Sequence, residues 1–276
     1  MPQQLKDTER LCLHTVTTKP WKIETAIEEY ARAGVKGISI WRDAVEGRDR
    51  AAVRRQVADA GLSGVSYVRG GFFASLDPAK RQASLEDNRA MIREASELGL
   101  PLIVLVCGAD PGQSLELSRR QITDALGILA PEAEEAGVVL GIEPLHPMYA
   151  DTRSAVNTLG QANDIAEAVG HPAVQVVVDV YHLWWDPFLP AEIARSGASG
   201  RLAAFHVCDW KVPTEDFLLD RGLMGEGCIP IPQIREQVEE AGFNGFIEVE
   251  IFSKRYWEMD QNEFLRKVVE AYKSAV

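Results

Sequence analysis

Short runs of apolar and β-branched residues alternate with longer amphipathic segments along the whole chain. Within each run the apolar residues follow one another without clean alternation, which is typical of strands covered on both faces in a parallel sheet. Eight runs are predicted as strands, over 11–18, 37–41, 62–68, 100–108, 138–144, 174–182, 202–210 and 246–252.

The segments between these runs have helical periodicity, for example 22–34, 83–99 and 118–137. Several end in glycine just before the next strand, where a left-handed residue commonly terminates a helix. The glycines predicted in this role are Gly34, Gly61, Gly99, Gly137 and Gly242. Eight βα units in 276 residues predict a single (β/α)8 TIM barrel domain over 1–276. A doubly wound open sheet is the competing fold, and the absence of a GxGxxG turn after the first strand weakens it.

Composition is that of an ordinary globular protein, with 46% hydrophobic and 25% charged residues. No apolar stretch approaches the roughly 18 residues of a membrane helix, and the polar start MPQQLKDTER is unlike a signal peptide. The four cysteines are scattered without a CxxC pair, which favours reduced thiols. Together these features predict a cytoplasmic protein without membrane contact.

The formal net charge is −12, from 41 acidic and 29 basic residues. A surface of that sign repels phosphate backbones, and this argues against nucleic-acid binding. Small, neutral or metal-bridged substrates remain open.

Four successive predicted strands end on a potential metal ligand: Glu143, Asp179, His206 and Glu250. Barrel active sites form at these strand ends, and strand alternation makes each group the last inward residue of its strand. Three carboxylates with one imidazole suit Mn²⁺ or Mg²⁺, with Co²⁺ or Zn²⁺ as substitutes. The alternative is four separately satisfied polar groups of the core. Glu248 has the same parity as Glu250, so either is a possible fourth ligand, with Glu250 nearer the rim.

The strand ends "IEP", "VDVYH", "FHVCDW" and "GFNGFIEVE" resemble the xylose isomerase-like TIM barrel superfamily of sugar isomerases and epimerases. That resemblance implies metal ligation by Glu143, Asp179, His206 and Glu250. It also implies a substrate-binding or orienting role for the histidine of the D-x-x-H motif, His182.

Three further residues are candidates for substrate contact. Arg221, in "DRGLMGEG", matches a family segment in which an arginine reaches the substrate. Trp41 lies at the second strand end and could stack on a sugar ring, and His14 ends the first strand. The alternative for Arg221 is a surface arginine, and for Trp41 it is simple packing at the rim.

His146 follows Glu143 by three residues, and ketose isomerisation by a glutamate pair does not require it. An imidazole there suits proton removal beside a metal-polarised carbonyl. The stretch "EPLHPMYADTRS" also resembles the α subunits of bacterial C-glycoside deglycosidases. That branch implies a lyase on 3-keto sugars with His146 as base and a small β subunit as partner.

Two other functions stay open. A ketose isomerase or epimerase would use Glu143 and Glu250 as its proton-transferring pair, and His146 would then be a loop residue packed on Pro147 and Met148. A metal-stabilised scaffold without enzymatic activity is the non-catalytic alternative.

Overall fold

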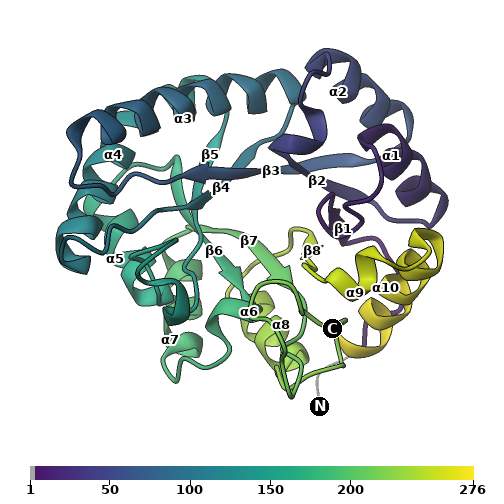
Figure 1. Cartoon of the computed structure of the whole chain (residues 1–276). Helices are drawn as coiled ribbons and strands as arrows, with labels where there is room; N and C mark the ends of the chain where they lie inside the picture. Colours follow the sequence, from purple (N-terminus) through teal and green to yellow (C-terminus); the bar gives the residue numbers. More distant parts are fainter. Residues whose placement is uncertain (1–3) are drawn as a thin grey trace.

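Eight parallel strands close into a barrel in the computed structural model, which describes residues 4–276 (Figure 1). Each strand pairs with the next, and β1 closes the ring with β8 through pairs such as Leu13 with Val249. The strands are β1 (Leu11–His14), β2 (Gly37–Trp41), β3 (Ser63–Gly71), β4 (Leu102–Val106), β5 (Val139–Ile142), β6 (Val174–Asp179), β7 (Leu202–Val207) and β8 (Ile247–Val249). The predicted (β/α)8 barrel is confirmed, and the open-sheet alternative is excluded.

Helices form the outer ring of the barrel (Figure 1). They are α1 (Ile23–Arg32), α2 (Arg50–Asp59), α3 (Pro78–Leu98), α4 (Leu115–Glu135), α5 (Leu159–Val169), α6 (Val180–Leu183), α7 (Leu189–Ala198), α8 (Ile231–Glu240), α9 (Lys254–Trp257) and α10 (Gln261–Ala275), with 3-10 turns η1 (Arg42–Val45) and η2 (Pro147–Tyr149). Local signals set their limits. Before α3, the Asp77 carboxylate accepts from the Ala79 amide at 2.8 Å, and Pro78 occupies the first helical position. None of the helices of residues 4–276 combines the length and apolar character that crossing a bilayer requires.

The glycines predicted to follow helices all have left-handed backbone, with φ between 70° at Gly99 and Gly137 and 95° at Gly242. Glycine adopts this conformation without a Cβ clash, so each helix can turn directly into the next strand. The prediction of these five positions is therefore confirmed.

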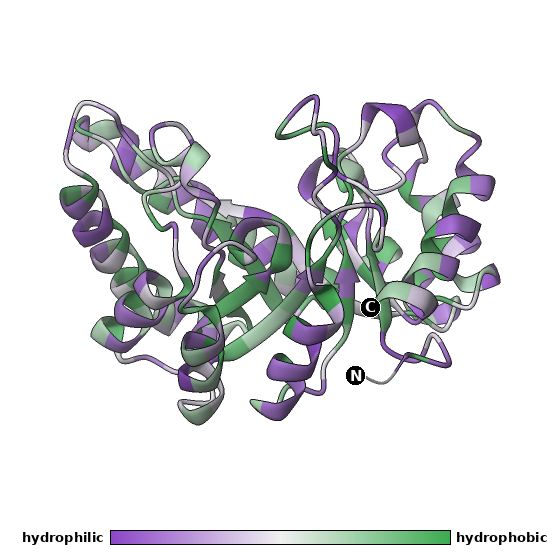
Figure 2. Ribbon diagram, turned by 90° about the horizontal axis from the view of Figure 1, so that it is seen from below, coloured by the Kyte–Doolittle hydropathy of each residue, from purple (hydrophilic) through white to green (hydrophobic). Residues whose placement is uncertain are grey.

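Two of the three apolar clusters in the described part of the chain fill the barrel and the layer around it. The larger lies between the strands and the surrounding helices, and Figure 2 shows apolar strands inside and polar outer faces on the helices. The smaller lies within the barrel and consists of Val68, Leu102, Val104, Val177 and Ala204. This inner apolar plug lies below the carboxyl ends of the strands, and the polar side chains that end the strands gather above it.

Several strands are shorter than the apolar runs that predict them. The run 174–182 divides at Asp179, whose side chain accepts from the Tyr181 amide at 2.8 Å and begins α6. The run 11–18 leaves the sheet after His14, and Thr17 Oγ1 then donates to the Val249 carbonyl at 3.0 Å. These buried continuations form the strand-exit loops around the site.

Candidate active site

The four predicted metal ligands lie together at the carboxyl end of the barrel, and all four are buried. Asp179 ends β6, His206 lies in β7, and Glu143 and Glu250 directly follow β5 and β8. One donor atom from each of Glu143, Asp179 and His206 lies within 4.8 Å of the others. The closest pair is Glu143 Oε1 with His206 Nδ1, at 3.0 Å. Three of the four side chains thus form one compact donor group.

Glu250 is linked to this group through the guanidinium group of Arg221. Its Oε2 accepts from Arg221 Nη1 at 3.0 Å, and the same Nη1 lies 3.8 Å from Asp179 Oδ2. Its Oε1 lies 3.1 Å from His14 Nδ1. Burial alone would raise the pKa of Glu250, but the charges of His14 and Arg221 hold it well below its usual range. Glu250 is therefore a stable anion facing the donor group.

A divalent cation fits this donor set. Asp179 Oδ2 and His206 Nε2 are buried side-chain atoms without a hydrogen-bond partner among residues 4–276, which is unusual because buried polar atoms are normally paired. Burial raises the pKa of Asp179 to about 7; the neighbouring Glu143 and Glu250 add to this, and Arg221 opposes it. A hard cation would satisfy both unpaired atoms and relieve the crowding of carboxylates.

Glu248 lies deeper in the barrel, and its Oε2 already has three close polar partners. Its Oε2 accepts from Ser39 Oγ at 2.5 Å and Ser66 Oγ at 3.0 Å, and it lies 3.1 Å from His14 Nε2. Although His14, His206 and Glu248 form a second close group of potential donors, Glu248 does not line the cavities above the strand ends. The structure thus places Glu250 in the cavity and Glu248 in a polar layer beneath it.

His182 and Arg221 form the wall behind Asp179. Arg221 Nη2 lies 3.4 Å from His182 Nε2, and the His146 amide lies 3.3 Å from Nδ1 of the same ring. Both neighbours are donors, so the ring stays neutral and accepts from one of them at a time. Burial, together with the Arg221 charge, lowers the pKa of His182 well below its usual value. Both side chains line the inner cavity.

His146 lies on the loop after Glu143, half-buried between two indoles. Its ring centroid is 5.6 Å from that of Trp185 and 5.2 Å from that of Trp210. Its Nδ1 accepts from the Met148 amide at 3.2 Å, so the proton of the neutral ring is on Nε2. Burial lowers the pKa of His146. His146 does not line the two cavities above the strand ends, and its role as the catalytic base stays a prediction.

The two remaining candidates differ in position. Trp41 lines the cavity, and its ring packs edge-on against Phe252 at 5.2 Å. His14 is completely buried below Glu250, and its two nitrogens face Glu248 and Glu250. The prediction of direct substrate contact finds support in this geometry for Trp41 but not for His14, which instead orients the two carboxylates.

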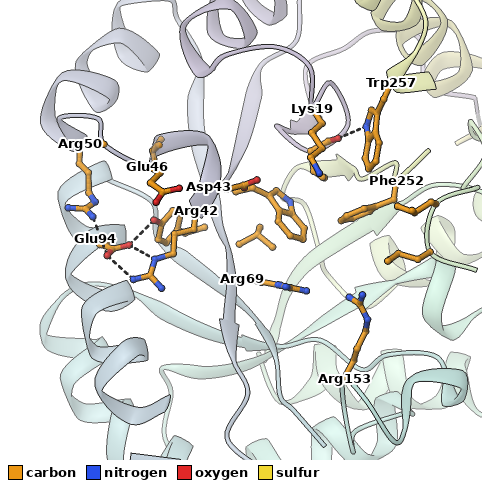
Figure 3. Close-up of a pocket in the computed structure, with 18 residues that line it drawn as sticks. Lys19, Arg42, Asp43, Glu46, Arg50, Arg69, Glu94, Arg153, Phe252 and Trp257 are labelled. Atoms are coloured by element: carbon orange, nitrogen blue, oxygen red, sulfur yellow. Dashed lines mark hydrogen bonds and ion pairs between the residues drawn. The ribbon is translucent and has the colours of Figure 1, made fainter. Parts of the chain in front are cut away.

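Two connected cavities lie above the strand ends. The outer one has a volume of about 790 Å³ and opens at the mouth of the barrel (Figure 3). The inner one, of about 30 Å³, is bounded by Glu143, His182, Arg221 and Glu250 among others. Trp41, Phe252 and two arginines line both. The outer volume lies in the range typical of small-molecule sites.

Those two arginines, Arg69 and Arg153, were not predicted from the sequence. Strand alternation places Arg69 on the outer face with Tyr67, but the register of β3 against β4 shifts between Val68 and Gly70. This irregularity turns Arg69 into the mouth. Arg153 comes from the loop after β5, where no periodicity indicates direction. For Arg69, the sequence offered one signal, which is a basic residue directly after the apolar run 62–68.

Comparison with known proteins supports the same fold and family. A family model described as the xylose isomerase-like TIM barrel matches residues 27–274. The inosose isomerase of Halalkalibacterium halodurans is 27% identical over 203 residues, which cover 71% of this chain and 68% of that protein.

Two solved structures are also similar. Protein SMc04130 from Sinorhizobium meliloti 1021 is 42% identical, with a TM-score of 0.93 over 98% of this chain and 99% of that one. A zinc-bound IolI protein is 21% identical and has a TM-score of 0.83, covering 95% of this chain and 96% of its own. The resemblance to the sugar isomerase and epimerase superfamily is confirmed, whereas the deglycosidase branch finds no support in these relatives.

Proposed function

We propose that this chain, which belongs to the xylose isomerase-like TIM barrel family, is a divalent-metal-dependent ketose isomerase or epimerase. The observation that carries the proposal is the pair of buried carboxylates, Glu143 and Glu250, facing one small cavity beside the unpaired donors of Asp179 and His206. The similarity to inosose isomerase supports an isomerisation. It favours this function over the cleavage of 3-keto glycosides.

Glu143, Asp179, His206 and Glu250 would hold the metal, with Mn²⁺ the first candidate and Mg²⁺ or Co²⁺ as alternatives. When bound, a divalent cation polarises the carbonyl and the neighbouring hydroxyl oxygen of a ketose. A hydrogen on the carbon between them then becomes acidic enough for a carboxylate to remove.

The two glutamates would divide the proton transfer. Glu250 is held ionised by His14 and Arg221, so it would take the proton from the substrate carbon. The C–H electron pair becomes a C=C bond and the carbonyl π pair moves onto its oxygen, which gives an enediolate. Glu143 follows β5, which is not a neighbour of β8 in the barrel, and its Oε1 lies 3.0 Å from His206 Nδ1. It would enter the reaction carrying a proton and return that proton to the enediolate, and exchange with solvent would then restore both carboxyl groups. Return to the other face of the same carbon gives an epimer, and return to the neighbouring carbon gives an isomer. Arg221 positions Glu250 and balances its charge.

Solvent deuterium incorporation tests this proposal. The Mn²⁺-loaded protein is incubated with a panel of ketoses in D₂O, and NMR follows exchange of the hydrogen next to the carbonyl. Replacement of Glu143 or Glu250 by Gln should lower the exchange rate by about 10²–10⁴-fold. The matched control is Glu116→Gln, on an exposed side chain of α4. Exchange at the wild-type rate in both cavity variants, or no exchange with any ketose, would contradict the proposal.

A 3-keto glycoside lyase is the second candidate. It requires the His146 ring, which lies outside the two cavities, to reach the substrate, and the two indoles beside that ring favour it. The ring lies on the loop beside His182, between Trp185 and Trp210, and such indoles suit an aromatic aglycone. In this function His146 would remove the C2 proton of the sugar, and the electron pair would expel the C1 aglycone. A small partner subunit would complete the enzyme.

The same preparation distinguishes the two functions. A 3-oxo C-glycoside is supplied and release of the aglycone is measured, with wild type and His146→Ala. Release that is lost in His146→Ala would support the lyase. Ketose exchange that is unchanged in His146→Ala, without aglycone release, supports the isomerase.

A further inference from the structure

The mouth of the barrel is more basic than the acidic chain as a whole. Five cationic side chains line the outer cavity: Lys19, Arg42, Arg50, Arg69 and Arg153. Arg42 and Arg50 are neutralised, because both pair with Glu94, at 2.9 and 3.1 Å. Each has a second acidic partner, Asp87 for Arg42 and Glu97 for Arg50. Figure 3 shows the two arginines and Glu94 on one side of the cavity, joined by dashed lines. These two arginines are therefore part of the wall between η1, α2 and α3.

Arg69 and Arg153 are different. Both are half-buried, and their side chains form no ion pair or hydrogen bond with any residue of the described range 4–276. In Figure 3 the two guanidinium groups point toward each other across the cavity floor, without dashed lines. Burial, together with the nearby charge of Arg153, lowers the pKa of Arg69. Two like charges thus lie near each other at half-buried positions in the cavity.

Aromatic rings hold the flat faces of both groups. The Arg69 guanidinium lies 5.1 Å from the ring centroid of Phe72 and 5.8 Å from that of Trp41. The Arg153 guanidinium lies 5.3 Å from the centroid of Tyr149. Contacts with π faces leave the N–H edges free. Those edges are the part of arginine that binds a carboxylate or phosphate in two-pronged fashion.

The nearby acids do not neutralise this pair. Asp43 and Glu46 are exposed at the outer edge of the cavity, where water screens them. Below the arginines, Glu250 already pairs with Arg221 and His14, and Glu143 with His206. A metal ion bound to Glu143 and Glu250 would also cancel the weak attraction between their negative charges and the two arginines.

The arginines and the donor group share one space. Arg69 and Arg153 line the inner cavity together with Glu143 and Glu250, and they also line the outer cavity. A ligand with its carbonyl at the carboxylates can therefore extend to the arginines without leaving the pocket.

We propose that Arg69 and Arg153 bind an oxyanion group of the substrate, so that the natural ketose carries a carboxylate or a phosphate at the end remote from its carbonyl. This inference rests on the proposed function for the identity of the rest of the substrate. The net charge leaves small, neutral or metal-bridged substrates open, and the two arginines favour a substrate with an anionic group.

Binding measurements test the oxyanion site without requiring turnover. The Mn²⁺-loaded protein is titrated calorimetrically with D-fructose, with its 6-phosphate and with its 6-carboxylate. At least one charged ketose should bind about tenfold or more tightly than D-fructose. In Arg69→Gln/Arg153→Gln this preference should disappear, because the affinity for the charged ketose should fall far more than the affinity for D-fructose. The matched control is Arg120→Gln, on an exposed arginine paired with Glu116. Stronger binding of one charged ketose identifies phosphate or carboxylate as the group.

Inorganic phosphate separates this inference from the proposed function. It is titrated into metal-free wild type and the double variant, so that a metal cannot contribute. If wild type binds phosphate and the double variant does not, the result supports the oxyanion site. This holds even if no ketose binds, because the absence of ketose binding would contradict only the isomerase proposal. Equal phosphate binding by both proteins, or equal affinity of wild type for charged and neutral ketoses, would overturn the oxyanion site.

Discussion

Glu248, in β8, and Glu250, directly after it, contact opposite nitrogens of a single imidazole, that of His14. Both distances are 3.1 Å. Burial tends to lower the pKa of His14, but the two carboxylates raise it above its ordinary value of 6.5. The shared ring thus ties a carboxylate that faces the cavity to one that is enclosed in the barrel, and the two have different functions.

Substitution of these glutamates should separate stability from activity. Glu248→Gln weakens the buried contacts with Ser39, Ser66 and His14, and should lower the free energy of unfolding by about 3–5 kcal/mol. The folded fraction should still bind Mn²⁺. Glu250→Gln should instead lower turnover by about 10²–10⁴-fold. Urea unfolding and ketose exchange measure the two effects. Loss of Mn²⁺ binding in Glu248→Gln, with full turnover in Glu250→Gln, would reverse the assignment.

Metal removal should affect activity and stability together. Dialysis against EDTA should abolish ketose exchange, and Mn²⁺ should restore it. At a free Mn²⁺ concentration about a hundred times its Kd, the folded state should gain about 2.7 kcal/mol. Asp179→Asn should lose most of this gain, because the unpaired Oδ2 is replaced by an amide. Glu116→Gln should retain it. A melting temperature that is indifferent to Mn²⁺ in the wild type would rule out the metal site.

The pH dependence of stability should include a contribution from His146. Burial lowers the pKa of His146 below 6.5, so the unfolded chain takes up the proton at a higher pH than the folded protein. The associated stability is complete above about pH 6.5 and is lost as pH falls through the lower, folded pKa. Metal-free wild type should therefore lose more stability than His146→Gln between about pH 7.5 and pH 5.5. Urea unfolding at both pH values measures the difference. An equal loss in the two proteins would show that the ring titrates normally.

Two tyrosines should act redundantly on the loop between β7 and α8. Tyr149 and Tyr181 both donate to the Phe217 carbonyl, at 3.0 and 2.8 Å. Either hydroxyl alone should keep the loop in place, so each single Phe variant should have nearly wild-type KM. The double variant should lose about 1 kcal/mol per bond and show faster amide exchange over 212–219 with a raised KM. Tyr67→Phe, which removes a hydroxyl bonded to Glu94, is the control. Unchanged amide exchange in the double variant would contradict the redundancy.

The barrel and its donor group could be predicted because they depend on local periodicity. Each of Glu143, Asp179 and His206 is the last inward residue of a parallel strand, and closure of the sheet brings such residues together. Strand alternation does not predict the direction of the Arg69 side chain, because an irregularity in β3 turns this side chain into the mouth of the barrel. Arg153 lies on a loop, where its position depends on tertiary packing rather than on periodicity.

The depth at which His14 lies was also beyond sequence reasoning. Parity indicates that its side chain points inward, but not that two carboxylates of β8 would enclose it. That arrangement depends on the stagger between β1 and β8, which pairs Cys12 with Glu248. Stagger is set by closure of the whole ring, and no single strand contains it.

The aliphatic plug inside the barrel determines the route by which substrate and product reach and leave the site. It consists of Val68, Leu102, Val104, Val177 and Ala204. Because these side chains fill the barrel below the site, substrate and product must enter and leave through the same opening, at the carboxyl ends of the strands. For an interconversion of two sugars, the product then occupies the space that the next substrate needs, and inhibition by product should be competitive. The net direction of flow would be set by whichever neighbouring reaction removes one of the two sugars faster.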